Sequence, residues 1–187
     1  MGSVEPPPGR PGPRVAAGGA SSSGRSPWRI AIFALAGLAA VLWFRRPAYL
    51  PELAIASANA DGTAAAAAEA PILCRGSKGC LVVYVAPWCG PCRASLPGDV
   101  ALADHIAPMG YETVFVVGMD EPADCLDMTK SIGRPARLDT DGRWAKAAGV
   151  RGVPHFLVTT PTGKIVKRQA GAYMAPAAQV AQLLGIS

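Results

Sequence analysis

Two cysteines separated by two residues give this sequence its clearest chemistry. They lie in Trp88-Cys89-Gly90-Pro91-Cys92, which follows an apolar run and opens a predicted helix. A thiolate in the first turn of a helix meets free backbone N–H groups and the positive end of the helix dipole, which lower its pKa. Cys89 is therefore the predicted nucleophile toward a substrate disulfide, and Cys92, one turn later, would resolve the mixed disulfide. Pro91 suits a first helical turn, and Gly90 permits close approach of a partner.

A pair of this spacing also occurs in structural zinc sites and, less often, as a structural disulfide. A zinc site needs a second pair of ligands at matching spacing. The other cysteines and histidines form no such pair; they are Cys74, Cys80, Cys125, His105 and His155. A redox role is favoured because the motif lies between a strand and a helix, and we expect neither a metal nor a cofactor.

The elements around this motif alternate between strands and helices. Apolar runs at 81–86 and 113–118 are typical of strands covered on both faces. Segments 156–159 and 164–167 flank a Pro-Thr-Gly turn, which predicts an antiparallel hairpin. Helices are predicted near 89–106, 122–132, 143–148 and 177–184. The order predicts an α/β domain over 73–187, with a central mixed sheet flanked by helices.

The residues before this domain differ in composition. Residues 1–27 are rich in Pro, Gly, Ser and Arg, which predicts a disordered tail. Residues 28–46 carry an apolar run between arginines, with a tryptophan near each end, and are predicted to form one transmembrane anchor in the lipid bilayer. Residues 47–72 are predicted to be an Ala-rich linker.

Two other interpretations of the apolar segment stay open. A cleaved signal peptide is one, since Ala58-Asn59-Ala60 has small residues around a cleavage point, and a buried core helix is the other. More arginines precede the segment than follow it closely, so the positive-inside rule places the N-terminus in the cytoplasm. We therefore expect a single-pass protein of the cytoplasmic (inner) membrane, with its α/β domain in the periplasm or another extracytoplasmic space.

The motif Trp88-Cys89-Gly90-Pro91-Cys92 resembles the active site of the thioredoxin superfamily. Pro97 matches the proline inside that family's active-site helix, and the segment 149–157 resembles the one that holds its cis-proline. This resemblance implies a thioredoxin-like fold and protein-disulfide oxidoreductase activity. It also implies that Val153-Pro154 is a cis peptide placed beside the cysteine sulfurs, where the backbone binds an extended substrate.

Within the superfamily, the sequence is most similar to the exported, membrane-tethered TlpA/ResA type. Residues 120–138 resemble the extra strand–helix insertion of that type. Two departures stand out, because the positions of the proton-relay carboxylates hold Val83 and Ser95. The N-terminal hairpin of TlpA-type domains is also missing or much shortened. The resemblance implies a reductant of protein thiols and disulfides, fed by a membrane electron donor, with apocytochrome c or a copper-site thiol pair among the conceivable substrates.

The remaining cysteines have separate predicted roles. Cys74 and Cys80 lie too far along the chain from Cys89 to join the active pair, and we expect them to form a structural disulfide that closes a small loop. Cys125 is expected to be a small apolar residue of a helix, although a third redox thiol is an alternative.

Two other functions remain as alternatives. A copper-binding chaperone module would use Cys89, Cys92 and His155, and a non-catalytic binding domain would explain the missing carboxylates. His105 is expected to be a solvated helix residue, while Trp144 and Met174 are expected to be packing residues rather than substrate contacts. The net charge of +5 is spread along the chain without basic runs and interleaved aromatics, so nucleic acid is not an expected partner.

Overall fold

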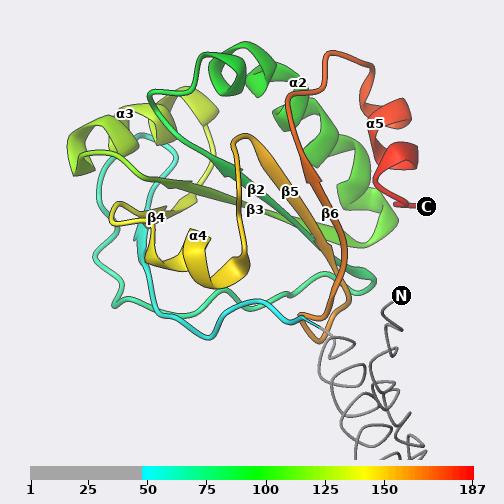
Figure 1. Cartoon of the computed structure of the whole chain (residues 1–187), viewed down its shortest axis with the longest axis horizontal. Coiled ribbons are helices and arrows are strands. Elements are labelled where there is room, and N and C mark those ends of the chain that lie inside the picture. Colours follow the sequence, from blue (N-terminus) through cyan, green and yellow to red (C-terminus); the bar gives the residue numbers. More distant parts are fainter. Residues whose placement is uncertain (1–47) are drawn as a thin grey trace, which may run out of the picture. The chain divides into compact units, whose positions relative to one another are not determined.

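The computed structural model describes residues 48–187, which form a mixed six-stranded sheet with helices on both faces (Figure 1). The strand order is β1-β4-β3-β2-β5-β6. The strands are β1 Ala56–Ala58, β2 Gly79–Val85, β3 Tyr111–Gly118, β4 Ala136–Asp139, β5 His155–Thr159 and β6 Ile165–Ala170. The helices are α2 Gly90–Ile106, η1 Ala107–Met109 (a 3-10 turn), α3 Pro122–Ile132, α4 Arg143–Ala148 and α5 Ala177–Leu183. The predicted α/β fold is confirmed.

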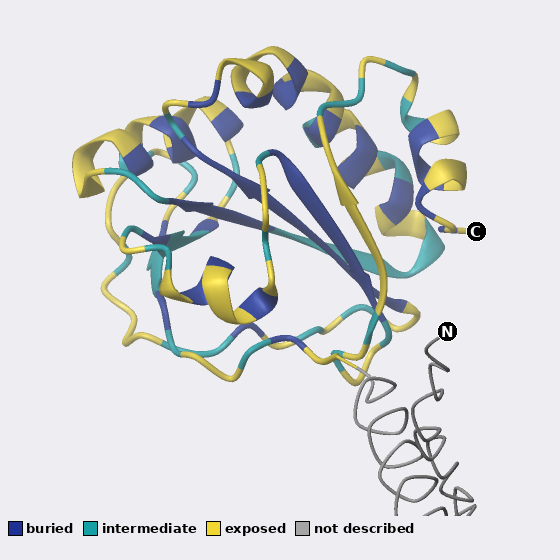
Figure 2. Cartoon of the chain, viewed as in Figure 1, coloured by how far each residue is buried: buried dark blue, intermediate teal, exposed yellow. Residues whose placement is uncertain are grey.

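The sheet is centred on β2, whose residues are all buried (Figure 2). It runs parallel to β3 and antiparallel to β5, and β3 is parallel to β4. Val83 and Val85 face a core shared with α2, α3 and α5. Val82 and Tyr84 face a second core shared with α4. Because both faces are covered, the continuous apolar run of β2 is the pattern that this position requires.

The prediction that 47–72 is a linker is wrong for its described part, residues 48–72. β1 pairs antiparallel with β4, and short bridges join Ile55 to Ala70 and Ala58 to Ala64. Ile55 and Ile72 are buried in the second core. The sequence does not indicate this role, because the strand is short and alanine-rich. It is stabilised by pairing with β4 rather than by a strong strand propensity of its own residues.

A buried carboxylate joins β4 to α4. Asp139 is 1% exposed and accepts hydrogen bonds from the Tyr84 hydroxyl at 2.8 Å and from the backbone N–H groups of Trp144 and Ala145, each at 2.9 Å. The rings of Tyr84 and Trp144 lie parallel with centroids 6.2 Å apart. Asp139 thus supplies the first turn of α4 with an acceptor for its free N–H groups.

The predicted tail at 1–27 and anchor at 28–46 lie outside the described residues. Among residues 48–187, no helix combines the length and the apolar character that crossing a bilayer would require.

A disulfide joins Cys74, in the loop before β2, to Cys80, the second residue of β2. The bond closes a loop over a sequence separation of 6, with the two Cα atoms 5.6 Å apart. Cys80 is fully buried. The disulfide therefore fixes the chain where it enters the central strand.

Replacing Cys74 and Cys80 by alanine should lower the free energy of unfolding by about 2 kcal/mol, since a short loop then regains its entropy in the unfolded chain. The measurement is urea unfolding in a Cys89→Ser, Cys92→Ser background, in which this is the one disulfide left. Adding a reductant should remove the difference between the two proteins. A difference that persists under reducing conditions would contradict the loop-closure explanation.

Candidate active site

The cysteine pair lies after the end of β2, at the start of α2. Cys89 is the N-cap of α2, and its Sγ accepts a hydrogen bond from the backbone N–H of Cys92 at 3.1 Å. The two cysteines form a disulfide, with Cα atoms 5.2 Å apart. Pro91 lies in the first turn, where a missing N–H leaves no intrahelical bond unmade. A sulfur in this position receives both the capping N–H and the helix dipole, so a thiolate formed there is stabilised.

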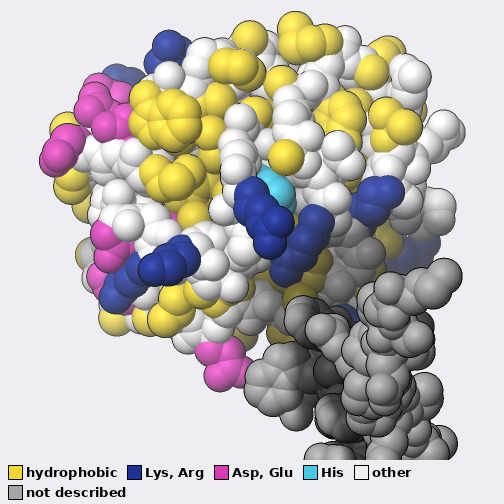
Figure 3. Space-filling view, viewed as in Figure 1, with side chains coloured by type: hydrophobic (Ala, Val, Ile, Leu, Met, Phe, Trp, Pro, Cys, Tyr) yellow, Lys and Arg dark blue, Asp and Glu magenta, His cyan; other side chains and the backbone are white. Residues whose placement is uncertain are grey.

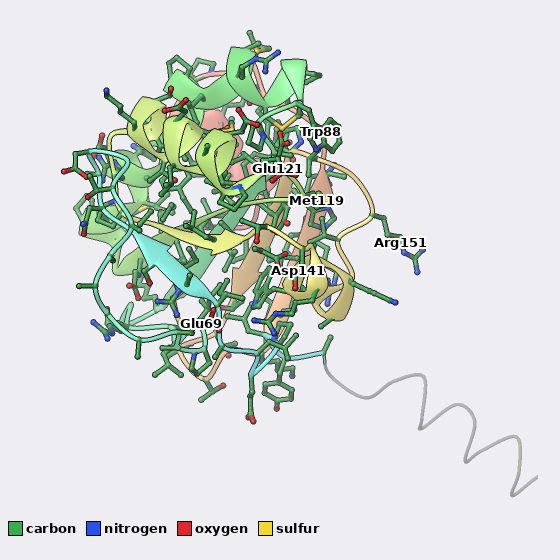
Figure 4. All side chains as sticks on the ribbon, turned by 90° about the vertical axis from the view of Figure 1, so that its left-hand side faces the viewer. Glu69, Trp88, Met119, Glu121, Asp141 and Arg151 are labelled. Atoms are coloured by element: carbon green, nitrogen blue, oxygen red, sulfur yellow. A yellow bond between two sulfur atoms is a disulfide. The ribbon has the colours of Figure 1, made fainter. Side chains whose placement is uncertain are left out.

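Trp88 presents a large apolar surface beside the disulfide, with 58% of the residue exposed. Its indole Nε1–H donates to the carbonyl of Met119 at 2.9 Å, in the loop after β3 (Figure 4). Met119 adopts a left-handed backbone with φ of 58°, which is uncommon for a residue with a side chain. The loop after β3 thus holds the Trp88 ring in place.

The Val153-Pro154 peptide bond is cis, and it brings the start of β5 to the disulfide. The carbonyl oxygen of Val153 lies 3.6 Å from Cys89 Sγ. The carbonyl of Pro154 accepts from the N–H of Gly171 at 2.9 Å. The resemblance predicts that Val153 and Pro154 lie beside the cysteine sulfurs, and the cis peptide bond and the Val153 contact agree with this prediction.

A groove of about 390 Å³ runs beside the disulfide between α2 and α3. Pro87, Trp88, Arg93 and Leu96 line one side. The α3 side carries Asp120, Asp124, Asp127, Met128 and Ser131. Acidic side chains gather over α3, at the left of the space-filling view (Figure 3). This border of the site is therefore negative, whereas the chain as a whole is positive.

Residues of α2 below the disulfide hold a carboxylate that the sequence prediction missed. Asp99 is 2% exposed and lies on the helix face that also buries Cys92 and Ser95. The Ser95 hydroxyl is 3.0 Å from Asp99 Oδ2 and 3.4 Å from the carbonyl oxygen of Cys92. Burial raises the pKa of Asp99 to about 7, and the Ser95 hydrogen bond opposes this shift. A signal was present in the sequence, because helical spacing places Asp99 on the same face as the apolar residues Leu96 and Leu102.

The position of Val83 is buried and apolar, so no carboxylate approaches the disulfide from β2. Pro97 lies inside α2 without ending it. Its missing N–H leaves the carbonyl one turn earlier without its usual helical donor.

His155 does not face the cysteine pair. It pairs with Tyr84 across β2 and β5, and Tyr84 belongs to the core on the α4 side, whereas both cysteines belong to the opposite core. Its two ring nitrogens are buried without a hydrogen-bond partner, and burial lowers its pKa. No cluster of three metal-ligating side chains occurs within 48–187. The arrangement required by the copper-chaperone alternative is therefore not formed, since strand alternation turns His155 away.

The other singled-out residues divide between core and surface. Cys125 is a free, fully buried thiol of α3, and burial raises its pKa to about 11. Trp144 is fully buried, as expected. Met174, expected to be a packing residue, is instead 78% exposed because it lies in the loop between β6 and α5. His105 is partly exposed near the end of α2.

Comparisons with known proteins agree with this geometry. No family model matches the chain. The thiol:disulfide interchange protein HelX of Rhodobacter capsulatus is 34% identical over 110 residues, which cover 56% of this chain and 60% of HelX. The chain thus spans about three fifths of the length of that relative.

Solved structures show the same fold. The pneumococcal exposed lipoprotein thioredoxin Etrx1 of Streptococcus pneumoniae superposes with a TM-score of 0.54 at 23% identity, covering 71% of this chain and 98% of its own. A thiol:disulfide interchange protein of the thioredoxin family from Chlorobium tepidum superposes with a TM-score of 0.52 at 19% identity, covering 75% and 95%. StoA of Bacillus subtilis gives 0.52 at 17% identity, covering 71% and 97%.

The sheet order, the helix-capping cysteine pair and the adjacent cis-proline define a thioredoxin-fold protein. In sequence, the chain is similar to a thiol:disulfide interchange protein, and in structure it is similar to thioredoxin-fold proteins.

Proposed function

We propose that this protein exchanges disulfides with protein thiols through Cys89 and Cys92. The observation that carries the proposal is the position of Cys89 Sγ at the N-cap of α2, 3.1 Å from a backbone N–H donor and 3.6 Å from the Val153 carbonyl. A sulfur held in this way is stabilised as a thiolate and lies next to the backbone of Val153, to which an extended substrate could bind. Trp88, Gly90 and Pro91 support the site, and Val153 and Pro154 contact the substrate.

The reducing direction proceeds in two steps. The Cys89 thiolate attacks one sulfur of a substrate disulfide, forms a mixed disulfide and releases the other substrate sulfur as a thiolate. Cys92 then loses its proton to solvent and attacks Cys89 Sγ, which breaks the mixed disulfide and releases the second substrate thiolate. The two released thiolates take up protons, so the substrate gains two electrons and the protein disulfide holds the oxidising equivalents. Cys89 is only 3% exposed, so the substrate must approach through the surface beside Trp88 and Val153.

The setting of this chemistry is proposed to be extracytoplasmic. The Cys74–Cys80 disulfide is the kind of bond that persists in oxidising compartments. The apolar segment at 28–46 supports a membrane tether in the bilayer, with the N-terminus inside and a membrane electron donor that returns the pair to the dithiol state. The Gly-Pro dipeptide between the cysteines supports a reducing role by analogy with thioredoxin, whose potential is about −270 mV.

Capture of substrates tests the proposal. Cys92→Ala should stall the reaction at the mixed disulfide, so partner proteins should accumulate on Cys89 and be released by a reductant. The readout is non-reducing electrophoresis followed by mass spectrometry, with the Cys89→Ala, Cys92→Ala double variant as the matched control. Equal amounts of reductant-sensitive adduct on both variants would show that Cys89 is not the attacking sulfur. Equilibration of the wild-type pair with glutathione then gives the direction, and a potential near the strongly oxidising end would overturn the reductant role.

A further inference from the structure

The positions of the two relay carboxylates in the families that this chain resembles hold Val83 and Ser95. The active-site helix α2 nevertheless buries a different carboxylate, that of Asp99. Cys92, Ser95 and Asp99 lie along a single face of α2 that points into the core. Asp99 lies seven positions after Cys92, which is two helical turns or about 10 Å along the axis. Ser95 lies between them, within reach of both.

Asp99 is poorly placed for a merely structural acid. Apolar side chains make up the core on this face, and a buried carboxylate there loses hydration that one hydroxyl cannot replace. Ionisable side chains of the same core are Cys89 and Cys92 at the start of α2, Tyr111 on β3, Cys125 on α3 and Tyr173 in the loop before α5. Burial raises the pKa of Asp99 while the Ser95 hydroxyl opposes this shift, and no salt bridge within the described residues includes this carboxylate.

We propose that Asp99, which is hydrogen-bonded to Ser95, is a positioning carboxylate that sets how readily Cys92 becomes a thiolate when it attacks the mixed disulfide. The inference rests on the proposed exchange reaction. When Asp99 is protonated, it can donate to Ser95, and Ser95 can donate to the Cys92 carbonyl. When Asp99 is ionised, the Ser95 hydroxyl turns to the carboxylate, and the Cys92 carbonyl loses the additional hydrogen bond from this hydroxyl.

The charge itself has the larger effect. A negative charge two helical turns from Cys92, about 10 Å along the helix axis, disfavours the thiolate by about tenfold if the effective dielectric of the interior is near 20. Below the Asp99 pKa the charge is absent, and above it the charge is present. The closure step, in which Cys92 attacks Cys89 Sγ of the mixed disulfide, depends on the fraction of Cys92 that is thiolate. Its rate should therefore rise less with pH above neutrality than the titration of an isolated thiol would predict.

The closure step can be measured with oxidised glutathione as the probe. Fully reduced protein is mixed with excess oxidised glutathione, quenched with acid at intervals and analysed by mass spectrometry. Cys89 first forms a mixed disulfide and releases one glutathione; Cys92 then attacks Cys89 Sγ and releases the second. The second step is independent of the glutathione concentration, so its rate reports Cys92 alone.

Asp99→Asn should close at the wild-type rate near pH 6 and about tenfold faster near pH 8.5. Asp104→Asn is the matched control, because it removes an exposed carboxylate from the same helix and should follow the wild type. In the wild type, the plot of closure rate against pH should bend where Asp99 ionises. The Ser95 hydrogen bond stabilises ionised Asp99, so its loss in Ser95→Ala should raise the Asp99 pKa and move this bend to higher pH. A structural defect would slow closure at every pH and would not move the bend.

Three outcomes decide the question. The pH-dependent gain in Asp99→Asn, absent in Asp104→Asn, supports the inference. Superimposable profiles of wild type, Asp99→Asn and Ser95→Ala overturn it while leaving the exchange function standing. If no protein forms the Cys89–glutathione adduct, the proposed function fails and the role of Asp99 falls with it.

Discussion

Cys89→Ser should lower the rate of disulfide exchange by at least about a thousandfold, because a serine hydroxyl stays protonated where a thiol ionises. The N-cap position and the Cys92 N–H would remain, since serine is itself a favoured cap. The fold should therefore be preserved, and the loss should fall on the chemical step. The measurement is the initial rate of thiol-dependent reduction of a disulfide-bonded protein such as insulin.

Cys125→Ser is the matched control for this change, because Cys125 is the free thiol of the described residues and is fully buried in α3. Its exchange rate should stay within about threefold of the wild type once folding is verified, since a thiol whose pKa is raised by burial is a poor nucleophile. Retention of a tenth or more of the activity in Cys89→Ser would refute the assignment of the nucleophile.

The active-site motif was predictable from sequence because its chemistry depends on local structure. An apolar strand that runs into a helix start fixes where Cys89 must lie, whatever the rest of the chain does. The same holds for the cis peptide at Pro154 and for the pair Cys74 and Cys80, although the former came from a resemblance rather than from the residues alone.

Features that depend on distant partners were less accessible. The segment 48–72 has no periodic pattern, and its burial depends on β4 and on the second core. His155 follows Pro154 directly, yet strand alternation sends it to the far face. Asp99 was missed because a carboxylate in a helix is ordinarily assigned to the solvent face; its spacing from Leu96 and Leu102 indicated the apolar face, and the packing of α2 shows that it is buried.

The turn around Asp139 connects the fold to the site. The backbone N–H of Met119 donates to the Asp139 carbonyl at 3.0 Å, and the Met119 carbonyl accepts from Trp88. The loop after β3 is therefore held at one end by the β4–α4 turn and in turn holds the Trp88 ring. A change at Asp139 should act first on stability and through this loop on Trp88.

Asp139→Ala should lower the free energy of unfolding by about 3–5 kcal/mol, because it leaves the Tyr84 hydroxyl and two backbone N–H groups buried without an acceptor. Asp141→Ala is the control, since this neighbouring carboxylate has a 63% exposed side chain in a surface ion pair with Arg143. Urea unfolding of the oxidised proteins should separate the two variants clearly. Equal stabilities would mean that water replaces the Asp139 carboxylate, and the loop that holds Trp88 would then have to be stabilised by the packing of Tyr84 on Trp144 alone.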